Sequence, residues 1–476
     1  MLFNSFIFLV FGALFFLLLY FIRRSKIPGF RWGFLVAASF FFYGWWDWRF
    51  LFLILASGFI DYFGALGIHR FPKRKKLFLA LSILGNVGSL AVFKYSGFIA
   101  ENLDHLLSLA GVESQLAENI PEFMLLLPVG ISFYTFQSMS YTIDVYRGSL
   151  KPTRSLLHFF AYLSLFPQLV AGPIVRARDL MPQLRVLRPT NELERWNGFK
   201  LIIIGFFKKV VLADNIAPLV NSGFANIHQT DNGPFWWMVM IGFAFQIYFD
   251  FSGYSDIARG LGKWMGLHFR LNFNHPYHSR SLREFWGRWH ISLSTWFRDY
   301  LYIPLGGSKK GRLNAYLFMW ITMVVSGLWH GAAWTFIIWG ALHALYISLE
   351  RMTHWPQLLK RLPGGGLISI LITNVLVLVG WVFFRAESFG DAVKILSDMF
   401  RWGGDGAFVI NDEIRNGMVW LAVSLVIELI TFFRFKPHLY LPRSLRRISD
   451  MLYVLLMLLA CIYLRGEGNV FIYFQF

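Results

Sequence analysis

The feature that most constrains this chain is its series of apolar blocks, which run for about 15 to 25 residues with very few charges. Blocks such as 6–22 and 368–384 are long enough for an α-helix to cross a hydrocarbon core of about 30 Å. Neither block alternates apolar and polar residues, as a strand of a membrane barrel would. Charged residues make up 15% of the chain, against roughly a quarter in soluble domains. The sequence therefore predicts an all-α polytopic membrane protein.

The blocks predict about ten to twelve crossings, in one domain that covers residues 1–476. The stretch 32–68 is too long for one helix and is broken by the polar aromatic run 45–49, so we expect two helices and an outer turn. Further crossings are expected near 201–221, 234–250, 314–328, 333–349, 367–384, 417–433 and 450–465.

Two segments differ from simple crossings. The stretch 156–172 is apolar but short, and it contains Pro167 and Gln168, which predicts a re-entrant or deeply buried segment. The stretch 252–312 mixes histidine and arginine with aromatic residues. This composition favours short amphipathic helices at the cytoplasmic interface.

Charge next to the blocks predicts the orientation. Arg23, Arg24 and Lys26 follow the first block, which is the reverse of the charge order in a cleavable signal. We therefore expect 6–22 to remain as a first transmembrane helix with its N-terminus outside, and the basic clusters to lie in the cytoplasm. The net charge of +18 then reflects these loops, and we do not expect nucleic acid as a partner.

The sequence lacks the motifs of several common kinds of enzyme and binding site. The single cysteine, Cys461, excludes an intramolecular disulfide. No H-E-x-x-H or C-x-x-C spacing is present, so no metal site is expected. No G-x-S-x-G, P-loop or G-x-G-x-x-G pattern is present either, which argues against serine hydrolases, nucleotide triphosphatases and dinucleotide-dependent enzymes.

His330 is the first candidate catalytic residue. It lies in 326–331, between the apolar runs 314–328 and 333–349, so the imidazole should be buried in the protein. The adjacent glycines permit close approach of backbone or substrate, and a neutral imidazole can take a proton from a hydroxyl. The ordinary alternative is a hydrogen-bonded core histidine.

His290 is the second candidate, at the head of an aromatic-rich helix within 284–296. From composition alone, a structural role is the stronger interpretation. Arg288 and Arg298 are near enough in sequence to hold the phosphates of an anionic donor. From the residues alone, the chain has a basic cytoplasmic mouth and one or two buried histidines. A proton-coupled transporter or flippase and a membrane scaffold therefore remain alternatives at this point.

A set of long motifs occurs in one order and is densest from about 125 to 390. Together these motifs resemble the membrane-bound O-acyltransferase (MBOAT) family, in its bacterial AlgI-like branch of alginate and polysaccharide O-acetyltransferases, and more distantly the DltB-like teichoic-acid D-alanylation proteins. The motifs are 128–137 (PVGISFYTFQ), 166–176 (FPQLVAGPIVR), 207–214 (FKKVVLAD), 248–256 (YFDFSGYSD), 272–277 (NFNHPY), 284–307, 328–331 (LWHG) and 381–385 (WVFFR).

The resemblance implies an MBOAT fold with a central funnel, in which His330 is the active-site histidine and His290 the second histidine linked to activity. The family run reads Phe-Trp-Arg-Arg-Trp-His, whereas Gly287 replaces its first arginine here. An oxyanion formed on a thioester needs fixed donors. Trp329, Asn272 and Ser326 are the candidates near the two histidines.

The resemblance also implies the reaction and its partners. Acetyl-CoA is the expected cytoplasmic donor, with no bound cofactor, and the acetyl group passes across the inner (cytoplasmic) membrane to an exported or cell-wall polysaccharide. Membrane lipids surround the chain. No SGNH-like domain is fused to it, so a separate periplasmic SGNH-like acetyltransferase is expected. Acylation of a lipid or of carrier-bound D-alanine is the alternative within the family.

Overall fold

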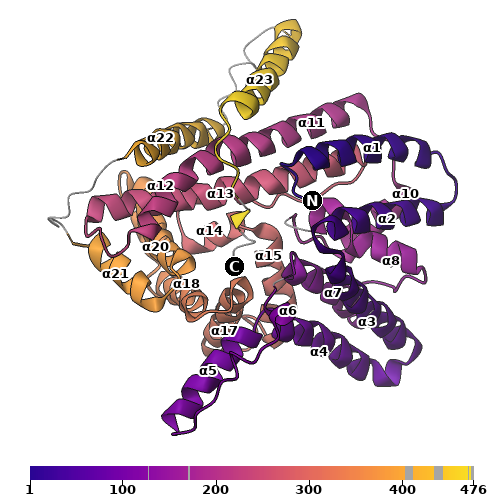
Figure 1. The fold of residues 1–476 in the computed structure, drawn as a ribbon, viewed down its shortest axis with the longest axis horizontal. Coiled ribbons are helices and arrows are strands. Elements are labelled where there is room, and N and C mark those ends of the chain that lie inside the picture. Colours follow the sequence, from indigo (N-terminus) through magenta and orange to yellow (C-terminus); the bar gives the residue numbers. More distant parts are fainter. Residues whose placement is uncertain (127, 170–171, 402–410, 434–442, 470, 473–476) are drawn as a thin grey trace. The chain divides into compact units, whose positions relative to one another are not determined.

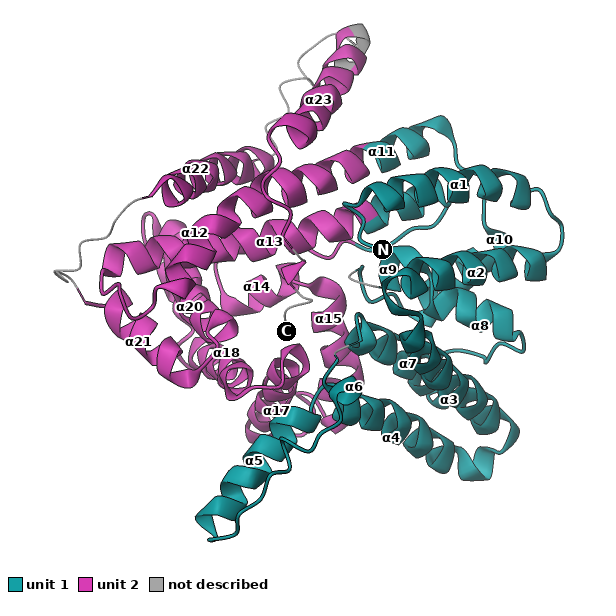
Figure 2. Ribbon diagram, viewed as in Figure 1, with its two compact units in different colours: residues 1–199, 258–270 teal, residues 200–257, 271–476 magenta. Residues whose placement is uncertain are grey.

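The computed structural model describes residues 1–476 except 127, 170–171, 402–410, 434–442, 470 and 473–476 (Figure 1). The described residues form helices and loops, with no strand among them. This confirms the predicted all-α class. The chain divides into two compact units (Figure 2); two of their boundaries lie inside the helices α11 (Glu192–Phe206) and α13 (Gly233–Trp264), and the third follows Arg270 in the loop after α13.

Unit 1 comprises Met1–Phe199 and Ala258–Arg270. Within it, the consecutive helices α3 (Leu51–Arg70) and α4 (Lys75–Phe93) pack against each other and against the later helix α7 (Ile131–Tyr146). The polar break at 45–49 ends one helix and a 3₁₀ turn starts the next, so the predicted division of 32–68 into two helices is confirmed. The helices that lie wholly in this unit are α1 (Phe6–Ile22), α2 (Pro28–Asp47), η1 (Trp48–Phe50), α3 (Leu51–Arg70), η2 (Pro72–Arg74), α4 (Lys75–Phe93), α5 (Ser96–Leu109), α6 (Glu122–Leu125), α7 (Ile131–Tyr146), α8 (Leu156–Leu163), α9 (Phe166–Leu169) and α10 (Ala177–Val186).

The core of the α3–α4–α7 bundle holds a buried carboxylate. Asp61 is 0% exposed and accepts hydrogen bonds from Asn86 Nδ2 at 2.8 Å and Thr142 Oγ1 at 2.7 Å, and also from the hydroxyls of Ser82 and Ser138. A buried charge is costly unless it is hydrogen-bonded. The four donors come from α4 and α7, so the cluster ties both helices to α3.

Unit 2 comprises Lys200–Ile257 and Leu271–Phe476. It contains the hairpin of α17 and α18 and a π-helical turn, η3, that links α11 to α12. The helices are η3 (Phe207–Ala213), α12 (Asp214–Ala225), η4 (Pro276–His278), α14 (Leu282–Arg288), α15 (Ile291–Phe297), η5 (Arg298–Tyr302), α16 (Ile303–Leu305), α17 (Arg312–His330), α18 (Trp334–Thr353), α19 (Trp355–Leu359), α20 (Gly365–Arg385), α21 (Phe389–Met399), α22 (Asp412–Phe432) and α23 (Arg443–Tyr463).

An ion-paired cluster joins η3 to the C-terminal segment. Lys209 Nζ lies 2.9 Å from Asp214 Oδ1 and 2.8 Å from Asp250 Oδ1, and it donates to the carbonyl oxygen of Asn469 at 3.1 Å. The second oxygen of Asp250 accepts the Ile472 amide at 2.7 Å. All three charged side chains are at most 4% exposed. Asn469 and Ile472 are therefore anchored to this buried cluster of unit 2.

Length and composition identify four segments of the described chain as able to cross a membrane: Pro28–Arg70, Pro72–Phe93, Gly365–Arg385 and Asp412–Phe432. The 17-residue α1 is shorter but also apolar. Several helices expose large apolar side chains, such as Phe6 at 78% and Leu456 at 65%. Soluble proteins rarely leave many such residues exposed together, which indicates lipid contact. The expected ten to twelve crossings stay a prediction.

The two segments that were predicted to differ from simple crossings, 156–172 and 252–312, can be compared with the structure. The segment from 156 divides into α8 and α9, and its residues 158–169 are buried, which agrees with a deeply buried segment. The prediction of short helices over 252–312 is correct from residue 276 onward, but it is wrong for 252–264. Those residues continue α13, a helix of 32 residues, because the run 254–264 keeps an apolar face that packs in the core.

Candidate active site

The indole ring of Trp329 lies close to both candidate histidines in unit 2. Its centroid is 4.9 Å from the His330 ring and 6.4 Å from the His290 ring. His330 is the last residue of α17, whereas His290 caps α15, so forty residues of sequence separate them. The structure therefore brings both predicted catalytic residues into one cluster.

The His330 imidazole is surrounded by aromatic rings. Besides Trp329, the rings of Trp339 from α18 and Phe384 from α20 have centroids 5.1 and 5.2 Å from it. His330 is 5% exposed. The ring is thus nearly dry, as predicted, and bulk water reaches only a small part of the residue.

Glycines beside His330 allow the helix hairpin to close. A Cβ on Gly327 would lie 2.2 Å from the carbonyl oxygen of Phe336, and a Cβ on Gly331 would lie 2.0 Å from the Phe336 ring. Both distances are far below van der Waals contact. The predicted close approach at these glycines is confirmed, and the group that approaches is α18.

His290 has a defined tautomer. Its Nδ1 lies 3.3 Å from Asn272 Oδ1, which also accepts the Ser292 amide at 3.1 Å and the Ser292 hydroxyl at 2.9 Å. Because this oxygen is the acceptor, His290 Nδ1 carries the hydrogen and Nε2 carries the lone pair. The Asn272 amide nitrogen donates to Ser255 Oγ at 3.2 Å, which holds the side chain in this orientation.

The backbone and burial of His290 are both unusual. Its φ of 40° and ψ of 55° lie in the left-handed region, which is uncommon for a residue other than glycine and is often found at functional sites. The residue is 0% exposed, and it lies between two seven-residue helices that are too short to cross a bilayer. Desolvation lowers the pKa of His290 to about 3, so the ring is neutral at physiological pH.

The two candidate phosphate-binding arginines already have partners. Arg288 Nη2 lies 2.6 Å from Glu284 Oε1 and Nη1 donates to the Asn274 carbonyl oxygen at 3.3 Å. Arg298 Nε lies 2.7 Å from Asp299 Oδ1, and its side chain is 60% exposed. A donor phosphate would have to compete with these carboxylates, more easily at the exposed Arg298. Their predicted role in donor binding stays a prediction.

Ser326 and Asn272 differ in their relation to His330. Ser326 lies one helical turn before His330 on α17, so the two side chains share a face. Asn272 makes its hydrogen bonds to His290, Ser292 and Ser255. The contacts of Asn272 are those of a residue that orients His290. The predicted oxyanion role of Ser326, Asn272 and Trp329 stays a prediction.

A third histidine belongs to the cluster and was missed by the sequence analysis. His343 on α18 is 0% exposed, and its ring lies 4.9 Å from Trp339 and 5.1 Å from Trp286. Neither ring nitrogen makes a hydrogen bond with the described residues. An ionisable residue in the apolar block after His330 was the signal that could have identified it.

A comparison with His158 in unit 1 shows how unusual this is. His158 has the contacts of an ordinary core histidine, since Nε2 donates to the Met181 carbonyl oxygen at 3.0 Å and Nδ1 lies 3.2 Å from Thr153 Oγ1. The indole nitrogens of Trp286, Trp339 and Trp381 are also buried. Like the ring nitrogens of His343, they have no hydrogen-bond partner among the described residues. Buried polar groups are rarely left without partners. The cluster therefore has the hydrogen-bonding capacity to hold a polar molecule.

The arrangement suits proton transfer and stabilisation of a developing negative charge. Neutral imidazoles can accept a proton, and indole N–H groups in a dry site are strong fixed donors to an oxyanion. Among the described residues, no group of three or more His, Cys, Asp or Glu side chains could hold a metal ion.

Comparison with known proteins identifies relatives along most of the chain. The model of the family described as "MBOAT, membrane-bound O-acyltransferase family" matches residues 149–386, which contain all three histidines of the cluster. The chain is 40% identical to "Probable alginate O-acetylase AlgI" of Pseudomonas aeruginosa, over 91% of this chain and 81% of that protein. It is 33% identical to "Peptidoglycan O-acetyltransferase" of Helicobacter pylori, over 96% and 94% respectively. It is 30% identical to "Teichoic acid D-alanyltransferase" of Bacillus subtilis, over 56% and 71%.

Proposed function

Because this chain belongs to the membrane-bound O-acyltransferase family, we propose that it takes acetyl groups from cytoplasmic acetyl-CoA and passes them across the membrane for O-acetylation of an exported or cell-wall polysaccharide. The protein is a membrane-embedded O-acyltransferase. The relatives similar over most of their length are named as acetylases of alginate or peptidoglycan, which favours a polysaccharide as the final acceptor. The observation that carries the proposal is the buried contact of His330 with Trp329, which also contacts His290.

His330 is the proposed catalytic base. An acceptor hydroxyl attacks the thioester carbonyl, His330 takes the hydroxyl proton, the carbon–sulfur bond breaks, and the proton ends on the thiol of coenzyme A. In a second route, the imidazole attacks the carbonyl, releases coenzyme A and then transfers the acetyl group to the hydroxyl. Both routes need a neutral imidazole, and the dry aromatic surroundings of His330 favour that form.

The attack places negative charge on the carbonyl oxygen. The Trp339 indole supports a role as its donor, because its nitrogen is buried with no acceptor among the described residues and its ring lies 5.1 Å from His330. This adds Trp339 to Trp329, Asn272 and Ser326 as candidate oxyanion donors. Loss of one such donor typically costs about 100- to 1,000-fold in rate.

The remaining assignments follow the family resemblance. The N-terminus lies in the periplasm and the chain is in the inner membrane, since the basic cluster after α1 favours the cytoplasmic side. Arg288 and Arg298 contribute to binding of the donor phosphates. A separate periplasmic SGNH-like acetyltransferase receives the acetyl group and modifies the sugar.

A His330→Ala variant tests the catalytic assignment. Loss of a general base should lower acetyl transfer by about 100- to 10,000-fold, measured as polymer ester content in cells and as turnover of radiolabelled acetyl-CoA by purified protein. His228→Ala is the matched control, because its side chain is 78% exposed. Unchanged ester content in the His330 variant, with normal protein levels, would rule out His330 as the base.

The same assay separates the two acyl donors of the family. Turnover of acetyl-CoA with no turnover of a D-alanyl carrier protein supports acetylation, and the reverse result supports the activity named for the Bacillus relative. Movement of an anionic solute without consumption of either donor would support a transporter instead.

A further inference from the structure

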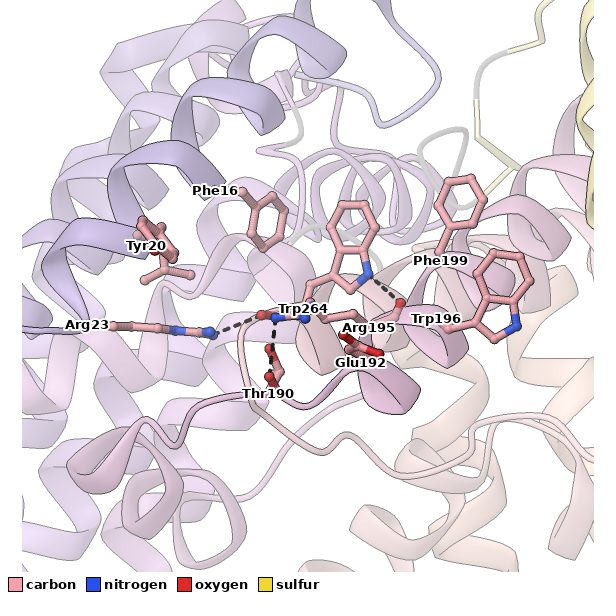
Figure 3. Close-up of a pocket in the computed structure, with 10 residues that line it drawn as sticks. Phe16, Tyr20, Arg23, Thr190, Glu192, Arg195, Trp196, Phe199 and Trp264 are labelled. Atoms are coloured by element: carbon pink, nitrogen blue, oxygen red, sulfur yellow. Dashed lines mark hydrogen bonds between the residues drawn. The ribbon is translucent and has the colours of Figure 1, made fainter. Parts of the chain in front are cut away.

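Unit 1 contains a pocket of about 490 Å³ that shares no residue with the histidine cluster (Figure 3). One wall is α1, and the other is formed by the start of α11 and by Trp264 at the end of α13. Thr190 and Glu192 line the rim. A cavity of this size can hold part of a small organic molecule.

One end of the pocket is apolar and aromatic. The Phe16 ring meets the Trp264 ring edge-on at 5.2 Å, and the Phe199 ring stacks on Trp264 at 6.3 Å. Leu19 adds an aliphatic surface from α1. These side chains form a surface that suits an acyl chain.

The pocket is also lined by two arginines, Arg23 and Arg195. Arg23 Nη2 donates to the Trp264 carbonyl oxygen at 2.9 Å and Arg195 Nη1 donates to the Thr190 carbonyl oxygen at 3.4 Å. Arg23 Nε is buried and has no hydrogen-bond partner among the described residues. Glu192 also lines the pocket, yet neither guanidinium forms an ion pair with a described carboxylate.

The two positive charges act on each other. Burial and the charge of Arg195 lower the pKa of Arg23, which follows α1 as its C-terminal cap. Arg23 is the half-buried member of the pair, and the like charge of Arg195 destabilises its charged form because neither guanidinium is paired with a described carboxylate. A phosphate group could accept hydrogen bonds from both guanidinium groups and reduce their repulsion, since guanidinium groups bind phosphate through paired hydrogen bonds.

The order of side chains along α1 matches a phospholipid. Phe16, Leu19, Tyr20 and Arg23 lie at helical spacings of three, four and seven residues, so they form one stripe. The stripe changes from apolar to cationic over about 10 Å of helix rise. The opposite face of α1 exposes Leu17 at 56% and Leu18 at 50%, which indicates direct contact with lipid.

We infer that this pocket binds an anionic phospholipid, whose head-group phosphate contacts Arg23 and Arg195 and whose upper acyl chain lies against Phe16, Phe199 and Trp264. Basic pockets beside membrane helices are recognised sites for such lipids. The lipid links α1 to α11 and α13 within unit 1, and so stabilises the part of the chain that precedes the matched family region.

Native mass spectrometry of the full-length protein in detergent tests this inference, with phosphatidylglycerol and phosphatidylcholine as probes. We expect phosphatidylglycerol to bind more tightly. The Arg23→Gln/Arg195→Gln double variant should lose about 100-fold in affinity, because each charge-assisted hydrogen bond contributes roughly tenfold. Lys26→Gln is the control, since Lys26 belongs to the same basic cluster and is exposed but does not line the pocket.

A second variant and a competition experiment keep the test decisive if the double variant folds poorly. Arg23 bonds the backbone of Trp264, so the single variant Arg195→Gln, at an exposed side chain, is included in case the double variant folds poorly. Competition with sn-glycerol 3-phosphate distinguishes a lipid from a free phosphate ester. Equal binding of the two lipids, equal loss in the Lys26 variant, or full displacement by glycerol phosphate at equal concentration would each overturn the inference.

Discussion

The His290 imidazole meets the Phe251 ring edge-on, with centroids 4.7 Å apart and planes at 90°. Phe251 in turn packs against Phe471 at 5.6 Å, so this side of the imidazole faces hydrocarbon. The polar contact with Asn272 on another side therefore determines the tautomer of the ring. Residues near the C-terminal end of the chain thus support a histidine that is part of the matched family region.

Asn272→Asp should change how His290 titrates. The variant keeps an oxygen near Nδ1 but adds a negative charge, and a carboxylate at this distance raises the pKa of a histidine by about one to three units from its value of about 3. Protonation of His290 should then inhibit acetyl transfer at a higher pH in the variant than in the wild type. Ser255→Ala is the control: it removes the acceptor of the Asn272 amide nitrogen but adds no charge near His290, so the pH profile should shift much less than in Asn272→Asp. Identical profiles in wild type and Asn272→Asp would contradict this role.

His290 should also make stability depend on pH. Its pKa is about 3 in the folded protein and 6.5 in the unfolded chain, so between these values only the unfolded chain binds the proton. Stability should therefore decrease as pH falls from 6.5 toward 3, by about 1.4 kcal/mol per unit of pH from this group.

The test compares wild type with His290→Asn in detergent, by the free energy of unfolding at a series of pH values. Asparagine tolerates the left-handed backbone of this position. Other groups also titrate in this range, so the difference between the two proteins isolates His290. Parallel pH curves would contradict the assignment.

His343→Phe should separate stability from activity. A buried group whose nitrogens lack partners costs free energy, so an aromatic hydrocarbon of similar shape should raise the unfolding free energy by about 1 kcal/mol or leave it unchanged. Acetyl transfer should fall by about tenfold or more if those nitrogens contact a polar substrate. His158→Phe provides the contrast, because it removes satisfied hydrogen bonds and should lower the melting temperature. Full activity in the His343 variant would show that its role is only packing.

Lys209→Met should destabilise unit 2 strongly. It leaves Asp214 and Asp250 buried without their cation, which typically costs about 3–5 kcal/mol. The neighbouring Lys208→Met is the matched control, because the Lys208 side chain is 22% exposed and pairs with one carboxylate, Asp256, at 2.7 Å. Its cost should be smaller than that of Lys209→Met, because the Lys208 side chain is partly exposed and a single carboxylate loses its cation. Comparable melting temperatures for the two variants would argue against the buried cluster as an anchor.

Local patterns in the sequence determined the helical membrane class, the division of 32–68 and the position of His330. Hydrophobic periodicity and block length act within one element, so they can be read without knowing the fold. The motifs also identified the family, and with it both histidines. The same patterns did not show that 252–264 would extend α13, because helix ends depend on what packs against them.

The tertiary structure alone decided which side chains meet. His290, His330 and His343 lie on α15, α17 and α18 or at their ends, and the indoles of Trp329 and Trp339 lie close to them. The hydrogen bond between Asn272 and His290 likewise joins residues eighteen positions apart, with the helices η4 and α14 between them in the sequence. Contacts between elements arise from packing of the whole unit, which the pattern of a single helix does not encode. For that reason the sequence could identify His330 and could have marked His343 as a buried ionisable residue, while the fold was needed to show that His343 and the indole donors belong to the same cluster.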